Sequence, residues 1–210
     1  MTDFTYPSGF KLLPDHFPRT AQTALVSQVL EKVAQSPLYQ PAMPRTGKPL
    51  SVRMTNFGPL GWVTDKDKGY RYEPAHPVTG APWPAMPRAL LDLWAAVTDW
   101  PDPPEACLVN WYGPDARMGL HVDNDEQAVS APVVSVSLGD KARFRLGGPG
   151  RKDPTRSFVL SSGDVVVLGG DARARHHGVD RIYPDTSTVL PPAWRPGRIN
   201  LTLRRVTHPS

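Results

Sequence analysis

The stretch Arg198–Arg204, RINLTLR, alternates polar and apolar side chains along its whole length. Successive side chains of a β-strand point to opposite faces, which separates two sets: Ile199, Leu201 and Leu203 on one face, and Arg198, Asn200, Thr202 and Arg204 on the other. A buried guanidinium needs an anionic partner. A small dicarboxylate would pair with both arginines through bidentate hydrogen bonds. The alternative is an edge strand with a solvated basic face.

Several other segments in the second half of the chain are typical of short strands. They are β-branched or alternating, and Gly and Pro separate them: CLVNWY, PVVSVSLG, ARFRLGG, RSFVLSSG and DVVVLGG. Closely spaced short strands of this kind indicate a sandwich or a barrel. Asn110 and Tyr112 alternate within NWY and would add hydrogen bonds to the same anion. Cys107 begins the first of these strands, where we expect a small buried apolar residue.

The first half of the chain has a different pattern. Apolar residues at helical spacing predict helices over residues 19–35 and 87–97, the second with Leu90, Leu91, Trp94 and Val97 as its apolar stripe. Between them, the run TDKDKG predicts a hairpin or an exposed loop, flanked by Trp62, Tyr70 and Tyr72. Aromatic side chains beside Lys and Arg stack on bases, although ordinary strand packing explains them as well. We therefore expect an N-terminal layer of helices and loops, residues 1–106, on a strand core, residues 107–210, in one integrated domain.

Composition limits the class of protein only broadly. The chain has 210 residues, a formal net charge of +4, 25 prolines and one cysteine. A mild positive excess suits nucleic acid without proving it. One cysteine excludes an internal disulfide and a Cys-based zinc site, which favours a reducing compartment and hence the cytoplasm. The N-terminus MTDFTYPSGFKLLPDHF does not resemble a signal peptide, and no run approaches the ~20 apolar residues of a membrane helix.

The segment GLHVDNDE, residues 119–126, concentrates acids in a basic chain. On a strand, His121 and Asp123 share one face and can occupy adjacent positions around a divalent ion. A third ligand must come from elsewhere, and the pair His176-His177 follows a strand-like run. Two histidines and one carboxylate, with three positions open, form the ligand set of non-haem Fe(II) oxygenases. The alternative is a packed or solvated histidine.

Taken in order, the motifs NWY, GLHVDNDE, PVVSVSLG, GDVVVLGG, HHG and RINLTLR resemble the AlkB-type DNA repair dioxygenases. The upstream segment GW…GYRYEP…PWPAMP is similar too, so the resemblance runs over roughly residues 57–204. It implies a mainly β (α+β) fold with a double-stranded β-helix (jelly-roll) core, N-terminal helices and a nucleotide-recognition lid. It also implies that the protein binds Fe(II) and 2-oxoglutarate and uses O2.

The resemblance also implies roles for particular residues. The iron ligands would be His121, Asp123 and His177, the last being the histidine directly before the glycine. The residues holding 2-oxoglutarate would be Asn110, Tyr112, Arg198, Asn200 and Arg204. The flipped-base pocket would be lined by Trp62, Tyr70 and Tyr72. Asp125 would contact the damaged base and Arg151 the nucleic acid, whereas we expect Glu126 to be a solvated or structural neighbour.

The activity that the resemblance implies is oxidative demethylation of 1-methyladenine and 3-methylcytosine in DNA, with RNA left open. Formaldehyde, succinate and CO2 are the products. Both lesions are cationic, so a carboxylate such as Asp125 favours them, and a base that pairs poorly is cheaper to flip. We expect a monomer that does not contact a membrane. Two alternatives stay open: a 2-oxoglutarate oxygenase with a non-nucleic-acid substrate, and a non-catalytic jelly-roll module with a structural metal. Against the module, structural zinc sites usually have four ligands.

Overall fold

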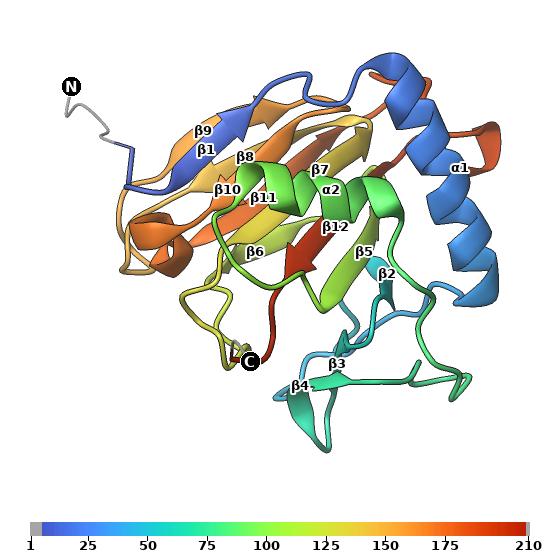
Figure 1. Ribbon diagram of the computed structural model, residues 1–210, viewed down its shortest axis with the longest axis horizontal. Coiled ribbons are helices and arrows are strands. Elements are labelled where there is room, and N and C mark those ends of the chain that lie inside the picture. Colours follow the sequence, from blue (N-terminus) through green and yellow to red (C-terminus); the bar gives the residue numbers. More distant parts are fainter. Residues whose placement is uncertain (1–5, 209–210) are drawn as a thin grey trace.

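Two antiparallel β-sheets form the centre of the computed structural model, which describes residues 6–208 (Figure 1). The six-stranded sheet has the order β1 (Phe10–Leu13), β10 (Val165–Leu168), β7 (Val133–Gly139), β12 (Arg198–Arg204), β5 (Ala106–Tyr112) and β2 (Arg53–Phe57). The four-stranded sheet has the order β6 (Met118–His121), β11 (His177–Tyr183), β8 (Lys141–Leu146) and β9 (Arg156–Leu160). From β5 to β12 the chain alternates between the sheets, except at the β8–β9 hairpin. This winding is that of a jelly roll, and it confirms the predicted fold class.

Strand β12 lies inside the six-stranded sheet, with β5 on one side and β7 on the other. The alternative of an edge strand is therefore wrong. The apolar set Ile199, Leu201 and Leu203 is fully buried against the helical layer. The polar set faces the space between the two sheets, where all four of its side chains line one pocket. The alternation in RINLTLR thus correctly predicts the two faces.

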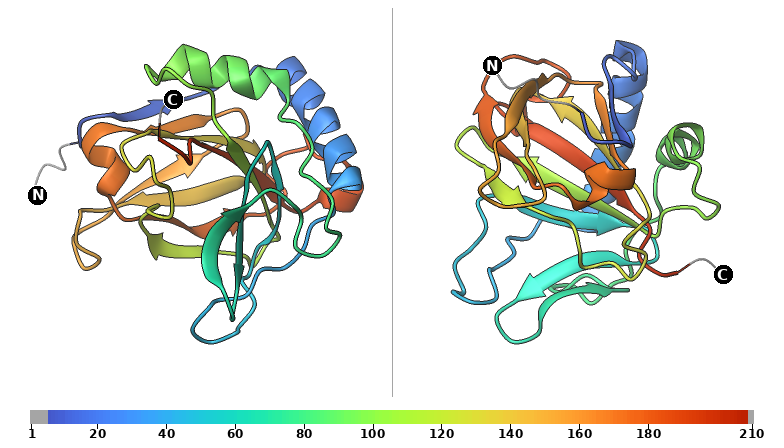
Figure 2. Two further views of the ribbon diagram at one scale, coloured as in Figure 1. Left: turned by 60° about the horizontal axis from the view of Figure 1, so that its bottom comes forward. Right: turned by 90° about the vertical axis from the view of Figure 1, so that its left-hand side faces the viewer.

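Two helices cover the outer face of the six-stranded sheet, and both lie on the same side of the sandwich (Figure 2, right). Helix α1 (Arg19–Gln35) has the predicted bounds, and α2 (Arg88–Val97) begins one residue later because Pro87 is its N-cap. In α2, Leu93 takes the buried place that the sequence suggested for Leu91, which is only half-buried. A helix has 3.6 residues per turn, so Leu90, Leu93, Trp94 and Val97 make a continuous stripe.

A second apolar cluster fills the closed part of the space between the sheets. It includes Phe144 and Leu146 of β8, Val166 and Leu168 of β10, and Val179 and Ile182 of β11. Alternate residues of each strand point inward, as expected for two packed sheets. The open part of the same space is lined by the polar residues described below.

The predicted hairpin is present as β3 (Gly61–Asp65) and β4 (Gly69–Glu73), which project below the sandwich in Figure 1. Asp65 Oδ1 accepts the backbone N–H groups of Asp67 and Lys68, which fixes the turn. Gly69 has φ +71°, a left-handed conformation that glycine adopts without steric cost. Trp62 and Tyr72 are direct cross-strand partners, and Tyr70 lies two residues from Tyr72, so the three aromatics share one face of the hairpin.

Cys107 is fully buried on β5, and burial raises the pKa of its thiol. This confirms its interpretation as a small apolar core residue. Within residues 6–208, no helix is both long enough and apolar enough to cross a membrane. The first five residues of the N-terminal stretch lie outside the described residues.

Candidate active site

The structure brings His121, Asp123 and His177 together at one end of the space between the sheets. His121 ends β6, His177 begins β11, and the two are direct cross-strand partners. One donor atom from each of the three residues lies within 4.8 Å of the others. The alternation in the sequence predicted that Asp123 would lie on the same strand as His121. In the structure β6 ends at His121, and Asp123 lies just beyond it. Arg173 bonds its backbone carbonyl and Arg204 bonds its side chain, so side chains anchor Asp123 in place of a strand ladder.

Both imidazoles present the same nitrogen to the centre of the cluster. Nδ1 of His121 lies 2.9 Å from the carbonyl oxygen of Gly119, and Nδ1 of His177 lies 3.1 Å from that of Arg175. A carbonyl only accepts, so in each neutral ring Nδ1 carries the proton and Nε2 keeps its lone pair. Each Nε2 lies 3.5 Å from an oxygen of Asp123. The donor set of two neutral imidazoles and one carboxylate fits a divalent transition metal.

Asp123 is held in its ionised form. Burial alone would raise the pKa of its carboxyl, but the Arg204 guanidinium and the His177 imidazole hold that pKa well below its usual value. Arg204 Nη2 donates to Oδ1 of Asp123 over 2.7 Å, whereas Oδ2 is buried without a hydrogen-bond partner. A buried carboxylate oxygen that lacks a donor is costly unless a cation takes its place. The structure therefore contains an anionic ligand atom directed at the same point as the two imidazoles.

A second unpaired group lies deeper in the same pocket. Arg198 is 1% exposed, and its Nη2 donates to Ser137 Oγ, but its Nε and Nη1 are buried without a partner. Burial lowers the pKa of this guanidinium. The Nε atom of Arg204 is also buried and unpaired. Arg198, with two donor atoms unpaired, and Arg204, with one, line one pocket and fit a small dicarboxylate such as 2-oxoglutarate.

The other residues that the sequence suggested for the cosubstrate lie beside these arginines. Asn110, Tyr112 and Asn200 all line the pocket. The Asn200 amide is held on both sides, because its Nδ2 donates to Ser135 Oγ and its Oδ1 accepts from Thr202. Ser135 and Ser137 were missed, although their polar positions in the apolar strand PVVSVSLG would have been a usable signal.

The pocket has a volume of about 480 Å³ and joins the His-Asp-His cluster to the hairpin. Trp62 and Tyr70 stack at its mouth with ring centroids 5.4 Å apart. Trp62 Nε1 donates to Asp125 Oδ2 over 2.8 Å. Arg151, in the loop after β8, also lines the pocket. The walls thus combine two histidines and an aspartate that could hold a metal, two buried arginines with unpaired donor atoms, an aromatic pair and a carboxylate in one cavity.

Tyr72 has a different environment from the other two aromatics. Its hydroxyl donates to Glu126 Oε1 and accepts from Arg204 Nη1. The Glu126 carboxylate also accepts from Arg204 Nη1 and from Arg173 Nη2, each over 2.7 Å. The Glu126 side chain has no exposed surface, so the solvated alternative for this residue is wrong and the structural one holds. Arg173 was missed, and nothing in its local sequence marks it as buried.

A jelly roll that carries this cluster belongs to a recognisable class. A family model described as the 2OG-Fe(II) oxygenase superfamily matches residues 9–204. The chain is 54% identical to an alpha-ketoglutarate-dependent dioxygenase AlkB homolog of Caulobacter vibrioides, over 96% of this chain and 89% of the relative. It is 42% identical to alpha-ketoglutarate-dependent dioxygenase AlkB of Escherichia coli, over 90% of this chain and 87% of the relative. The solved structure of OsALKBH1 superimposes with a TM-score of 0.76 at 30% identity, covering 97% of this chain and 99% of that one.

The chain therefore belongs to the AlkB family of 2OG-Fe(II) oxygenases. The predicted family, enzyme class and cofactor set of Fe(II), 2-oxoglutarate and O2 are confirmed. A non-catalytic binding module is thereby set aside.

Proposed function

We propose that this protein removes N-linked methyl groups oxidatively from bases of DNA, with 1-methyladenine and 3-methylcytosine as the lesions. The observation that carries the proposal is the single pocket of about 480 Å³ that connects the His-Asp-His cluster to a stacked Trp–Tyr pair and a carboxylate. An aromatic pair provides a surface on which a base extruded from the nucleic acid stacks. In the same pocket, His121, Asp123 and His177 would hold the iron that supplies the oxidation, with O2 as the oxidant and 2-oxoglutarate as the cosubstrate.

The protein's own residues have distinct tasks in this proposal. His121 Nε2, His177 Nε2 and Asp123 hold the iron. Arg198 pairs with the distal carboxylate of 2-oxoglutarate, and Arg204, Asn110, Tyr112 and Asn200 surround the remainder. When bound, the iron would use O2 to oxidise 2-oxoglutarate to succinate and CO2 and to oxidise the N-methyl group, which leaves as formaldehyde.

The lid hairpin determines which base enters. Trp62 and Tyr70 stack on the base, and Asp125 lies beside them with its carboxylate already oriented by the Trp62 indole N–H. Although Asp125 is exposed, its negative charge at the pocket would favour a cationic base over a neutral one. Arg151 at the rim binds a phosphate of the strand that carries the lesion. Tyr72, by contrast, anchors the hairpin to Glu126 and Arg204.

The same proposal extends to the setting of the enzyme. Residues 1–106 supply the lid, the helical layer and the two outer strands of the six-stranded sheet, and residues 107–210 supply the strands that carry the catalytic residues, within one domain. We propose that the protein acts as a monomer in the cytoplasm, with RNA as a second substrate class. The supports are the buried reduced thiol of Cys107 and a pocket completed by one chain.

Turnover of a defined lesion tests this function. The protein is incubated with Fe(II), 2-oxoglutarate and an oligonucleotide that contains 3-methylcytosine, and formaldehyde and the repaired base are measured. We expect equal amounts of both, and none from His177→Ala. Succinate formation without base repair on DNA or RNA would contradict the proposal and favour a 2-oxoglutarate oxygenase with a non-nucleic-acid substrate.

A further inference from the structure

The outer face of the four-stranded sheet, together with the loop after β8, carries an excess of positive charge that extends beyond the active-site pocket. In β8 the inward residues Ala142, Phe144 and Leu146 are buried, so Lys141, Arg143 and Arg145 point outward. Arg181 of β11 is exposed on the same face. We call these four residues, with Arg151 and Lys152 of the loop after β8, the basic strip.

The basic strip contains most of the net charge of the protein. Its six cations lie with three acids, Asp180 among them and Asp153 and Asp185 at its two ends, which leaves a net +3. The whole chain has a net charge of +4. The remainder of the molecule is therefore nearly neutral, and the positive excess is concentrated on this face.

The arrangement is unfavourable for the isolated sheet. Arg143 and Arg181 are direct cross-strand partners, and like charges placed opposite each other destabilise a sheet. Asp180 offsets part of this repulsion, because its carboxylate lies 2.7 Å from Arg143 Nε and 3.7 Å from Arg145 Nη1. One carboxylate cannot balance four cations. An external polyanion bound along the strip would relieve the remaining repulsion.

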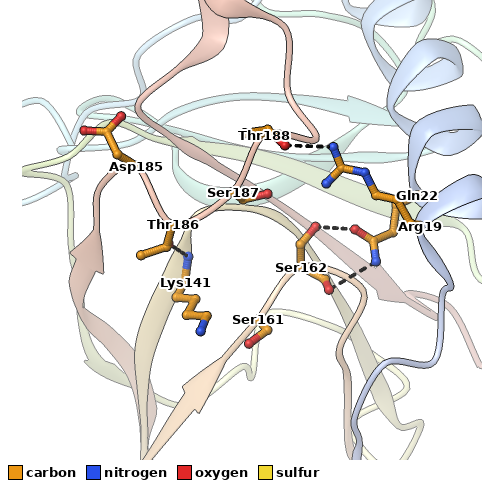
Figure 3. A pocket seen from close by; sticks show the side chains of 9 residues that line it. All are labelled: Arg19, Gln22, Lys141, Ser161, Ser162, Asp185, Thr186, Ser187 and Thr188. Atoms are coloured by element: carbon orange, nitrogen blue, oxygen red, sulfur yellow. Dashed lines mark hydrogen bonds between the residues drawn. The ribbon is translucent and has the colours of Figure 1, made fainter.

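The two ends of the basic strip indicate the path along which a bound polyanion would lie. Arg151 lines the active-site pocket. At the other end, Lys141 lines a polar pocket of about 360 Å³ with Arg19, Ser161, Ser162 and Thr188 (Figure 3). Outward residues of one strand are about 6.7 Å apart, which is comparable to the spacing of successive phosphates along an extended nucleic-acid strand. The strip therefore makes a continuous row of cations from the catalytic pocket to the opposite end of the sheet.

We infer that the basic strip binds the phosphate backbone of the nucleic acid that flanks the lesion. This inference rests on the proposed function and extends it from the flipped base to the adjoining strand. The contact is independent of base sequence, since guanidinium and ammonium groups bind phosphates without reading base edges. Its consequence is that long substrates bind more tightly than short ones that fill only the catalytic pocket.

A comparison of substrate lengths tests the strip. The double variant Arg143→Gln/Arg181→Gln is measured against a methylated trinucleotide and a methylated 20-nucleotide strand, with Kd of the long strand followed over salt concentration. Each lost phosphate contact lowers the slope of log K against log salt by about 0.7. We expect a roughly tenfold weaker Kd for the long strand in the double variant. Turnover of the trinucleotide should match that of the wild-type protein.

Two further variants complete the experiment: one should strengthen binding of the long strand, and the other is a control. Asp180→Asn makes the strip more positive, and it should tighten binding of the long strand. Arg88→Gln removes an arginine of α2 whose side chain is 84% exposed, far from the strip, and should change nothing.

Three outcomes would contradict the inference that the basic strip binds the phosphate backbone. They are an unchanged salt slope in the double variant, equal losses for short and long substrates, and lost binding to phosphatidylserine vesicles with normal DNA binding. Failure of the wild-type protein to repair even the trinucleotide is a different result, which would refute the proposed function itself.

Discussion

Arg204 Nη1 donates to Glu126 Oε1 over 2.7 Å, across 78 residues of sequence, while Nη2 of the same guanidinium bonds Asp123. One arginine thus joins the metal-ligand carboxylate to a fully buried glutamate, and that glutamate accepts the hydroxyl of Tyr72 from the lid hairpin. The β3–β4 hairpin, Asp123 and Arg204 are consequently parts of one hydrogen-bonded network. In a buried network of this kind, a charged group that loses its partner destabilises the fold strongly.

The Glu126→Gln variant should lose considerable stability. The substitution preserves shape but leaves two buried guanidiniums facing a neutral amide, and breaking a buried ion pair costs about 3 kcal/mol. Thermal or urea unfolding of the metal-free protein measures the change. The control is Asp92→Asn, which removes an exposed ion pair with Arg88 on α2 and should cost under about 1 kcal/mol. Equal stability of both variants would show that the network contributes little.

The two adjacent histidines should behave differently towards iron. His177 presents Nε2 to Asp123, whereas His176 is absent from the donor cluster and its backbone pairs with Gly147 and Gly148. We expect His177→Ala to weaken Fe(II) binding at least about a hundredfold, and His176→Ala to leave it near the wild-type value. Anaerobic calorimetric titration with Fe(II) measures both. The reverse pattern would show that the third ligand is His176.

The Arg198→Lys variant should selectively weaken binding of 2-oxoglutarate. Lysine keeps the charge but loses the planar donor pair that matches a carboxylate, and hydrogen bonds between charged groups are worth about 2 kcal/mol. The KM for 2-oxoglutarate should therefore rise roughly thirtyfold, with a smaller change in kcat. Titration of 2-oxoglutarate into the Mn(II)-loaded protein gives an independent Kd, and Arg88→Lys is the matched surface control. Unchanged affinity would place the cosubstrate elsewhere.

Asp125→Asn should reduce the preference for charged lesions. A neutral amide keeps the hydrogen bond to the Trp62 indole but no longer attracts a cationic base. We expect kcat/KM to fall roughly tenfold on 3-methylcytosine and to change little on 3-methylthymine, which is neutral. The ratio of the two rates in one mixed-substrate assay is the measurement. Equal losses on both lesions would remove the charge argument.

Glu105 should make stability depend on acid pH. Burial alone would raise the pKa of its carboxyl, but three hydrogen bonds from Val206 and Thr207, with the nearby Arg205, lower it below the ordinary 4.5. A carboxyl whose pKa is lower in the folded than in the unfolded protein stabilises the fold when it is ionised. This stabilisation is complete at a pH above the unfolded-state pKa, and it is lost as the pH falls through the folded-state pKa. The free energy of unfolding should thus decrease as the pH falls below about 4.5. Glu105→Gln should flatten that part of the pH profile, and an unaltered profile would assign it to other carboxyls.

The strand patterns of the sequence predict those parts of the site that depend on local alternation. RINLTLR correctly separates a buried apolar face from a polar one, because β12 keeps its period over seven residues in the middle of a sheet. The motif resemblance identifies His121, Asp123 and His177, and the structure gathers them.

The parts that could not be predicted depend on distant contacts. The burial of Glu126 requires arginines 47 and 78 residues away. Likewise, nothing within GYRYEP distinguishes Tyr72, which bonds Glu126 and Arg204, from Tyr70, which stacks on Trp62. The local sequence records which residues share a face, but the ion pairs between elements are decided by tertiary packing.

The single thiol of the protein, that of Cys107, lies where oxidants formed at the active site do not reach it. Iron and O2 generate peroxide and related oxidants when O2 is consumed without oxidation of the substrate, which is called uncoupled turnover. Thiolates are the first side chains that such oxidants attack. Cys107 is fully buried on β5, with its pKa raised by burial, so it is neutral and out of reach. The catalyst thus carries no accessible thiolate for its own by-products, and repeated uncoupled turnover should damage other side chains before Cys107.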